Sequence, residues 1–246
     1  MRIGDDLYLG AAYAPNPIGS DGNPAPMEAG VGPMGRVYVF DVVPLTLQAA
    51  GLASSQNPGS GGSFTLTAGT GVTSRVRADG TTEFVLDTPR SVTITAAGAN
   101  TATYKVTGYD VYGQLLTQNL AAPSTSTVAT VKAFKTIISV TNLNATAGTN
   151  GLTVGYNDKL GLPVRVTDVG YVTNVKWAQT LAADAGTFVA ADTTDPATAA
   201  TTDVRGQYTP SSAANGTRRL VMTIALPAIA VGPQATRIGA FGVTQA

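Results

Sequence analysis

The side chains that could carry acid–base or nucleophilic chemistry are few in this chain of 246 residues. Neither histidine nor cysteine is present, which excludes a Ser-His-Asp triad, a Cys-His pair, and zinc or haem sites of the common kinds. A carboxylate-based glycosidase or depolymerase needs only two acidic groups. The only glutamates are Glu28 and Glu83, with Asp87 close to the second. Because Glu83 is predicted to point to solvent from a strand, we expect no catalytic residue and no enzyme.

Four aspartates, Asp184, Asp192, Asp195 and Asp203, lie in a stretch rich in alanine and threonine. Carboxylates can bind Ca²⁺, but this spacing matches neither an EF-hand loop nor a nonapeptide repeat. Aspartate readily forms turns by bonding to its own backbone, and we predict that role here. The glycine-rich run at residues 59–62 is not followed by a helix, so it is not a phosphate-binding loop. The sequence therefore predicts no metal site and no cofactor.

The densest group of basic side chains is Arg75, Arg77 and Arg90. Arg75 and Arg77 are two residues apart, so on a strand they share one face. Two alternatives are open for this pair: carboxylate partners within the chain, or an anionic ligand. The chain carries 15 basic and 15 acidic residues, which argues against nucleic-acid binding through a general phosphate-neutralising surface. Only 12% of its residues are charged, which indicates that part of the surface contacts other subunits.

Apolar and polar residues alternate along most of the chain, which indicates strands. The charged groups named above must therefore be positioned by strands. The clearest hairpin joins residues 72–77 to residues 82–87 through the turn at Asp79 and Gly80. Residues 91–95 alternate strictly between apolar and hydroxyl side chains, as half-buried strands do. Such short strands, separated by Gly, Asn and Asp turns, predict an all-β fold. We expect an antiparallel β-sandwich of jelly-roll or Ig-like type, with almost no helix.

Three segments are expected along the chain. Residues 1–36 form an extended N-terminal arm, and residues 37–162 form the β-sandwich. Residues 163–246 form a further β segment with a long surface excursion, either separate or completing the same sandwich. This last segment contains a strong closing strand at residues 218–226, with four apolar side chains on one face: Leu220, Met222, Ile224 and Leu226.

The arm is recognised by its composition. Five prolines and many glycines between residues 10 and 36 exclude a helix and a central strand. The segment is either an extended arm laid on a partner or a loose tail. As an arm, it would contact a partner through its larger apolar side chains: Tyr13, Ile18, Met27, Val31 and Met34.

Trp177 is the only tryptophan. It is expected either to cap the core at the end of a sheet or to act as an interface hot spot. No stretch approaches the 18 or so apolar residues of a membrane span, and the first six residues lack the apolar run of a signal peptide. We therefore expect a chain made in the cytoplasm that has no membrane partner.

One stretch resembles a module of tailed-phage virion proteins. The run RSVTIT at residues 90–95 is followed by YKVTGYDVYGQ at residues 104–114. In that module a strand ending in VTG leads to a D-x-x-G turn and then to an apolar strand, here residues 115–120. The resemblance covers residues 86–226 and rests on the residue types of the segments and on their order along the chain. Further segments that fit are residues 131–137, 154–156, 160–163, 188–192 and 203–208.

The resemblance implies a head decoration, or cement, protein. Such a protein is non-enzymatic, binds the major capsid protein on the outer capsid surface, and stabilises the head. We expect a homo-oligomer at a lattice symmetry axis, a trimer in preference to a dimer, without nucleic acid as a partner. The alternative is a tail or adsorption-apparatus component with a carbohydrate-binding β-sandwich.

Overall fold

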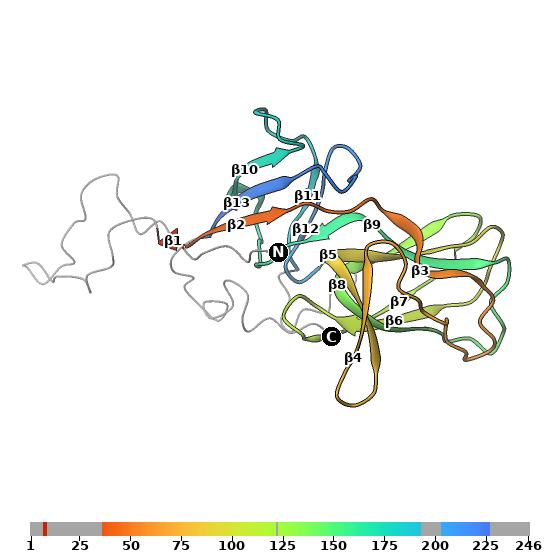
Figure 1. Cartoon of the computed structure of the whole chain (residues 1–246). Helices are drawn as coiled ribbons and strands as arrows, with labels where there is room; N and C mark the ends of the chain where they lie inside the picture. Colours follow the sequence, from red (N-terminus) through yellow and green to blue (C-terminus); the bar gives the residue numbers. More distant parts are fainter. Residues whose placement is uncertain (1–6, 9–35, 122, 193–202, 227–246) are drawn as a thin grey trace, which may run out of the picture.

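The computed structural model describes residues 7–8, 36–121, 123–192 and 203–226 (Figure 1). Over these ranges the secondary structure is β-strand, apart from one turn of 3-10 helix, η1 (Val169–Tyr171), and every strand pairing is antiparallel. The predicted all-β antiparallel class is confirmed. None of the described residues forms a helix with the length and apolar character that crossing a membrane requires. The strands are β1 (Leu7–Tyr8), β2 (Arg36–Val42), β3 (Gln48–Gln56), β4 (Val72–Val76), β5 (Thr82–Thr95), β6 (Tyr104–Tyr109), β7 (Leu115–Leu120), β8 (Thr127–Asn142), β9 (Leu152–Gly161), β10 (Val172–Trp177), β11 (Thr187–Val189), β12 (Gln207–Thr209) and β13 (Leu220–Leu226).

The larger sheet has nine strands, with β11-β12-β9-β5-β8-β6-β7 in order, β3 also paired with β9, and β4 also paired with β5. Strand β5 pairs first with β4 and, beyond Arg90, with β9. The register slips between Val85 and Arg90, and such irregularities bend a strand. The sheet curls over a first core, whose largest fully buried members include Leu52, Ile94, Tyr104, Phe134 and Tyr156.

The smaller sheet has the order β1-β2-β13-β10 and lies beside the larger one (Figure 1). Strands β2 and β13 pair along their whole length, from Arg36 opposite Leu226 to Val42 opposite Leu220. The apolar face predicted for the closing strand is confirmed, because all four of its side chains are buried in a second core. That core also takes in Phe40 and the end of the large sheet at Leu160.

The two cores do not divide at residue 162. The first draws on residues 52–156, and the second on residues 38–42 together with residues 160–226. The surface excursion expected after Trp177 is also tied to the body. Strand β11 pairs with β12, and β12 pairs with β9 of the large sheet. The predicted arm contacts Tyr13, Ile18, Met27, Val31 and Met34 lie outside the described residues.

The predicted hairpin of β4 and β5 is confirmed and projects from the body (Figure 1). Gly80 has φ +82°, a conformation that suits glycine. The Asp79 carboxylate accepts a hydrogen bond of 2.9 Å from the backbone N–H of Thr81. The hairpin carries Arg75 on β4, Arg77 directly after β4 and Glu83 on β5.

Strands β3 and β9 pack backbone against backbone at Gly155. A Cβ on Gly155 would lie 1.8 Å from the carbonyl oxygen of Gln48 and 2.6 Å from the carbonyl carbon of Ala49. Gly155→Ala must therefore push β3 away from β9, and we expect a loss of about 2 kcal/mol or more in the free energy of unfolding, measured in urea. The control is Gly59→Ala, where an added Cβ meets nothing within 4 Å. Equal stability of the two variants would contradict this packing.

Candidate functional site

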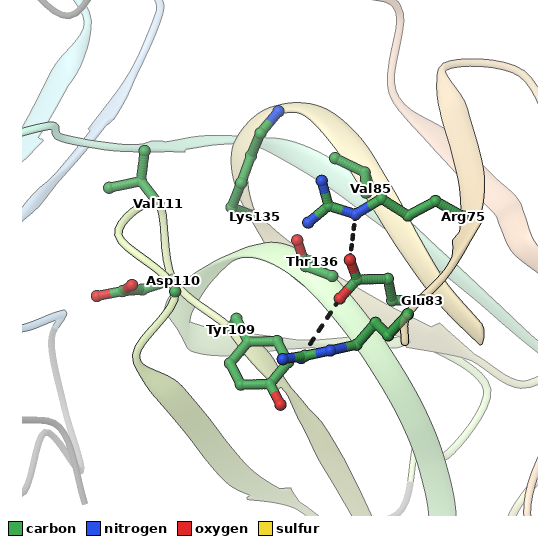
Figure 2. Close-up of a pocket in the computed structure, with 10 residues that line it drawn as sticks. Arg75, Glu83, Val85, Tyr109, Asp110, Val111, Lys135 and Thr136 are labelled. Atoms are coloured by element: carbon green, nitrogen blue, oxygen red, sulfur yellow. Dashed lines mark hydrogen bonds and ion pairs between the residues drawn. The ribbon is translucent and has the colours of Figure 1, made fainter. Parts of the chain in front are cut away.

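A pocket of about 360 Å³ opens between the β4–β5 hairpin and the turn that joins β6 to β7 (Figure 2). Strand β8 supplies the rest of its wall. The pocket gathers three cationic side chains, two carboxylates, an aromatic ring and two valines. Its lining consists of Arg75, Arg77, Glu83, Val85, Tyr109, Asp110, Val111, Gly113, Lys135 and Thr136.

The strand register explains why residues so far apart in sequence share this pocket. Arg75 lies opposite Glu83 across the hairpin. Thr136 of β8 lies opposite Val85 on one side and opposite Tyr109 on the other. Side chains that oppose one another in an antiparallel sheet point to the same face. Arg75, Glu83, Val85, Thr136 and Tyr109 therefore share one face of four adjacent strands, β4, β5, β8 and β6.

Glu83 is the acidic centre of the pocket. The Arg75 Nε donates to its carboxylate, and Arg77 Nη1 lies 3.6 Å from Glu83 Oε2 (Figure 2). Glu83 is only 2% exposed, so the prediction that it points to solvent is wrong. The hairpin register sets the two arginines over it, and a buried carboxylate needs such partners. The carboxylate-partner alternative for Arg75 and Arg77 is thereby confirmed.

The two arginine side chains are 65% and 39% exposed, respectively. The Arg77 guanidinium lies over the Tyr109 ring, 4.7 Å from its centre, an arrangement stabilised by cation–π attraction. Figure 2 shows the Asp110 carboxylate directed away from Glu83, and it forms an ion pair of 2.7 Å with Arg205. Among the described residues, Glu83 is thus the one carboxylate that pairs with Arg75 and Arg77, so these two arginines keep an excess of positive charge.

Lys135 adds the third cation at the rim. Its Nζ donates to the carbonyl oxygens of Leu86 and, at 3.1 Å, Asp87. Burial lowers the pKa of Lys135 below its ordinary value; the negative charge of Asp87 opposes this shift, and the positive charges of Arg75 and Arg90 add to it. Sequence reasoning singled out neither Lys135 nor Tyr109, because only the pairing of β8 with β5 and β6 brings them to the arginines.

Arg90 does not join the other two arginines. Its side chain is fully buried where the two sheets meet. Nε and Nη2 donate to the two Asp87 oxygens at 2.9 and 2.6 Å. Nη2 also reaches the carbonyl oxygen of Leu45 at 2.7 Å, while Nη1 reaches Asp158 Oδ1 at 3.2 Å and the Asn157 carbonyl oxygen at 3.3 Å. The basic cluster predicted from the sequence is therefore two separate sites.

The two carboxylates that pair with Arg90 also accept hydrogen bonds from the backbone of other elements. Asp87 accepts from the backbone N–H of Leu45 at 2.8 Å, and Asp158 accepts from that of Ala214 at 3.1 Å. Burial raises the pKa of Asp158, although the Ala214 N–H and the Arg90 charge act against this shift. The arginine thus ties the β2–β3 connection, β5, β9 and the loop before β13 into one junction.

A third buried group surrounds Arg205. Its guanidinium pairs with Asp110 and lies over the Tyr112 ring, 4.9 Å from the ring centre. Asp110 also holds the D-x-x-G turn, because its Oδ1 accepts from the backbone N–H groups of Tyr112 and Gln114 at 2.8 Å each. Asp110 therefore stabilises this turn.

The described aspartates of the alanine- and threonine-rich stretch, Asp184, Asp192 and Asp203, do not line the pocket. Asp203 accepts from the backbone N–H of Arg205 at 2.8 Å, which is the turn role predicted for it, and also from that of Ala133. Asp184 accepts from the Tyr208 hydroxyl at 2.7 Å. Asp195 lies outside the described residues. The described ranges contain no group of three or more side chains that could hold a metal ion.

Trp177 is 3% exposed and belongs to the second core. Its indole N–H donates to the Ser212 hydroxyl at 2.9 Å, which satisfies the polar atom of the buried ring. This placement favours the core-capping alternative over the interface one, because a ring enclosed by its own chain offers little surface to a partner.

Comparison of the chain with protein-family models, with curated proteins and with solved structures finds no match.

Arg90→Met tests the junction. The substitution leaves Asp87 and Asp158 without their cation in a poorly solvated site, and we expect a loss of about 3 kcal/mol or more in the free energy of unfolding. The matched control is Arg219→Met, which removes an exposed ion pair with Asp41 and should cost far less. Urea unfolding followed by circular dichroism measures both. Similar losses for the two variants would refute a special role of the buried arginine.

Lys135→Met tests the electrostatics of the rim. Because the pKa of Lys135 lies below 10.5 in the folded chain, the unfolded chain binds more protons between that lowered pKa and 10.5. Linkage then makes the lysine's contribution to the free energy of unfolding rise with pH through this window. We expect wild-type protein to gain stability relative to Lys135→Met as pH increases towards 10.5. A stability difference that stays constant or narrows over this range would contradict the lowered pKa.

Proposed function

We propose that the chain is a non-enzymatic structural protein of a tailed-phage virion, which binds the outer capsid lattice and stabilises the head. The resemblance over residues 86–226 supports this assignment. The structural observation that carries it is the place where the two terminal segments leave the body. Arg36, the first residue of β2, lies directly opposite Leu226, the last residue of β13.

The register of β2 and β13 therefore places Arg36 and Leu226, the described residues next to the two terminal segments, at the same end of the smaller sheet. Strand β1 pairs there too, with Leu7 opposite Val37. A body in which both segments join at one end of a sheet can present them together to one surface. This arrangement suits attachment to a lattice through segments, with the larger sheet held away from it.

Attachment of this kind needs no chemistry. A protein that binds the assembled shell better than the loose subunit stabilises the shell by mass action. Many copies convert a modest affinity per site into high avidity. The proposed partners are the major capsid protein and further copies of this chain, in a trimer on a three-fold axis in preference to a dimer.

The type of β-sandwich is proposed as well. Two antiparallel sheets that share the second core support a β-sandwich, and we infer a jelly-roll or Ig-like arrangement of it. The buried, paired charged side chains support a structural role as well. Arg90, Arg205 and Glu83 are buried, and each pairs with partners inside the chain, which braces the sheets.

Attachment through the arm predicts the effect of a fivefold variant in which Tyr13, Ile18, Met27, Val31 and Met34 are replaced by serine. Lost burial of five apolar side chains should weaken binding to heads by tenfold or more. Co-sedimentation with heads assembled from the major capsid protein of the same phage measures the binding.

The matched control replaces Leu143 and Leu181, two exposed leucines of the body, by serine. Leu181 follows the Trp177 end of β10, which pairs with Leu220, so it lies towards the end of the smaller sheet opposite the exit of the segments. Both variants should keep the thermal unfolding temperature of the wild type. Unchanged head occupancy by the fivefold variant would refute the arm attachment, and electron microscopy that finds the labelled protein on the tail would favour the adsorption alternative.

A further inference from the structure

We infer that the pocket between the β4–β5 hairpin and the β6–β7 turn binds one carboxylate group on an aliphatic stem, the side chain of an aspartate or glutamate on a protein partner. The inference rests on the proposed function only for the partner's identity, which would be a neighbouring subunit in the capsid lattice.

The pocket holds more hydrogen-bond donors than its own carboxylate uses. Arg75 donates to Glu83 through Nε, and a guanidinium has four further N–H donors. The Arg77 Nη1 to Glu83 Oε2 distance of 3.6 Å is too long for a hydrogen bond. No other acceptor for either guanidinium occurs in the described part of the chain. These partly exposed donors are available to a second carboxylate.

The two arginines are also held in place before any ligand binds. Arg75 is fixed by Glu83, and Arg77 rests on the Tyr109 ring. A guanidinium that is already oriented loses less side-chain entropy when it forms a bidentate pair with a carboxylate. Tyr109 is thus a positioning residue, because its ring holds the Arg77 guanidinium in place.

The surroundings favour a carboxylate over a phosphate group. Glu83 neutralises part of the arginine charge, and Lys135 directs its Nζ to the carbonyl oxygens of Leu86 and Asp87. The remaining charge suits a monoanion better than a phosphate dianion. Val85 and Val111 provide apolar wall, against which the methylene groups of an acidic side chain can pack. The chain's zero net charge supplies no wider field for a polyanion.

The test is an NMR titration of the full ¹⁵N-labelled chain with N-acetyl-glutamate whose α-carboxyl group is blocked as a methylamide, so that the side-chain carboxylate is its only charge. N-acetyl-glutamine blocked in the same way serves as the neutral control, and inorganic phosphate serves as the competing anion. We expect saturable shifts of the Arg75 and Arg77 Nε–Hε signals and of the Val111 and Gly113 amides with the glutamate probe. Equal shifts with N-acetyl-glutamine, or no shifts at these groups, would overturn the site. Tighter binding of phosphate would overturn the choice of a carboxylate.

Variants assign the binding to the pocket. Arg77→Gln should weaken N-acetyl-glutamate binding about tenfold, the usual worth of one charge-assisted hydrogen bond. Glu83→Gln, which removes the competing negative charge at constant shape, should strengthen it severalfold. Arg219→Gln, at the exposed pair with Asp41 on the smaller sheet, should leave it unchanged. Equal weakening by Arg219→Gln would show non-specific charge attraction and would overturn the site.

Fold and partner are controlled separately. Arg77→Lys keeps the charge but loses the planar fork, so it should bind with intermediate affinity, and a wild-type amide spectrum outside the pocket confirms that each variant is folded. The titration uses the isolated chain, so its result does not depend on capsid binding. An Arg75→Gln/Arg77→Gln double variant that fails to bind N-acetyl-glutamate but occupies heads normally would overturn the lattice partner and leave the pocket standing. Loss of head binding in the double variant would support both.

Discussion

The burial of the Arg90 guanidinium at the junction of the two sheets is the constraint on which the rest of the structure depends. A charge in so poorly solvated a place is costly unless every donor is paired. Five N–H groups find five acceptors, two on Asp87, one on Asp158 and two carbonyl oxygens. The acceptors come from β5, from β9 and from the β2–β3 connection. The arginine is therefore satisfied only when these elements are together.

This junction sets the geometry on both of its sides. Towards the smaller sheet, the Asp158 carboxylate holds the loop before β13, and β13 then pairs with β2 and closes the second core. Towards the hairpin, the Asp87 carbonyl oxygen accepts from Lys135, which belongs to the rim of the pocket. The same short stretch of β5 thus connects the Val42 and Leu220 end of the smaller sheet with the arginine-lined pocket.

Although the net charge of the chain is zero, its positive and negative groups are unevenly distributed. Arg90 and Arg205 are matched by carboxylates inside the body, where the pairs brace neighbouring strands. In the pocket, Arg75 and Arg77 share the single carboxylate of Glu83, and Lys135 lies at the rim with its Nζ on the carbonyl oxygens of Leu86 and Asp87. An excess of positive charge is therefore local and partly exposed. Both this excess and the position of Arg36 and Leu226 at one end of the smaller sheet support the proposed attachment to neighbouring subunits.

The sequence by itself determined the all-β class, the β4–β5 hairpin and the inward face of the closing strand. These follow from alternation and from the Asp79-Gly80 turn, which act over a few residues. Only the tertiary structure decided that β2 pairs with β13 and that Arg90 lies apart from Arg75 and Arg77. It also decided that Glu83 is buried. The physical reason is that strand register and the pairing of buried charges depend on residues distant in sequence, and no local pattern encodes which of them will meet.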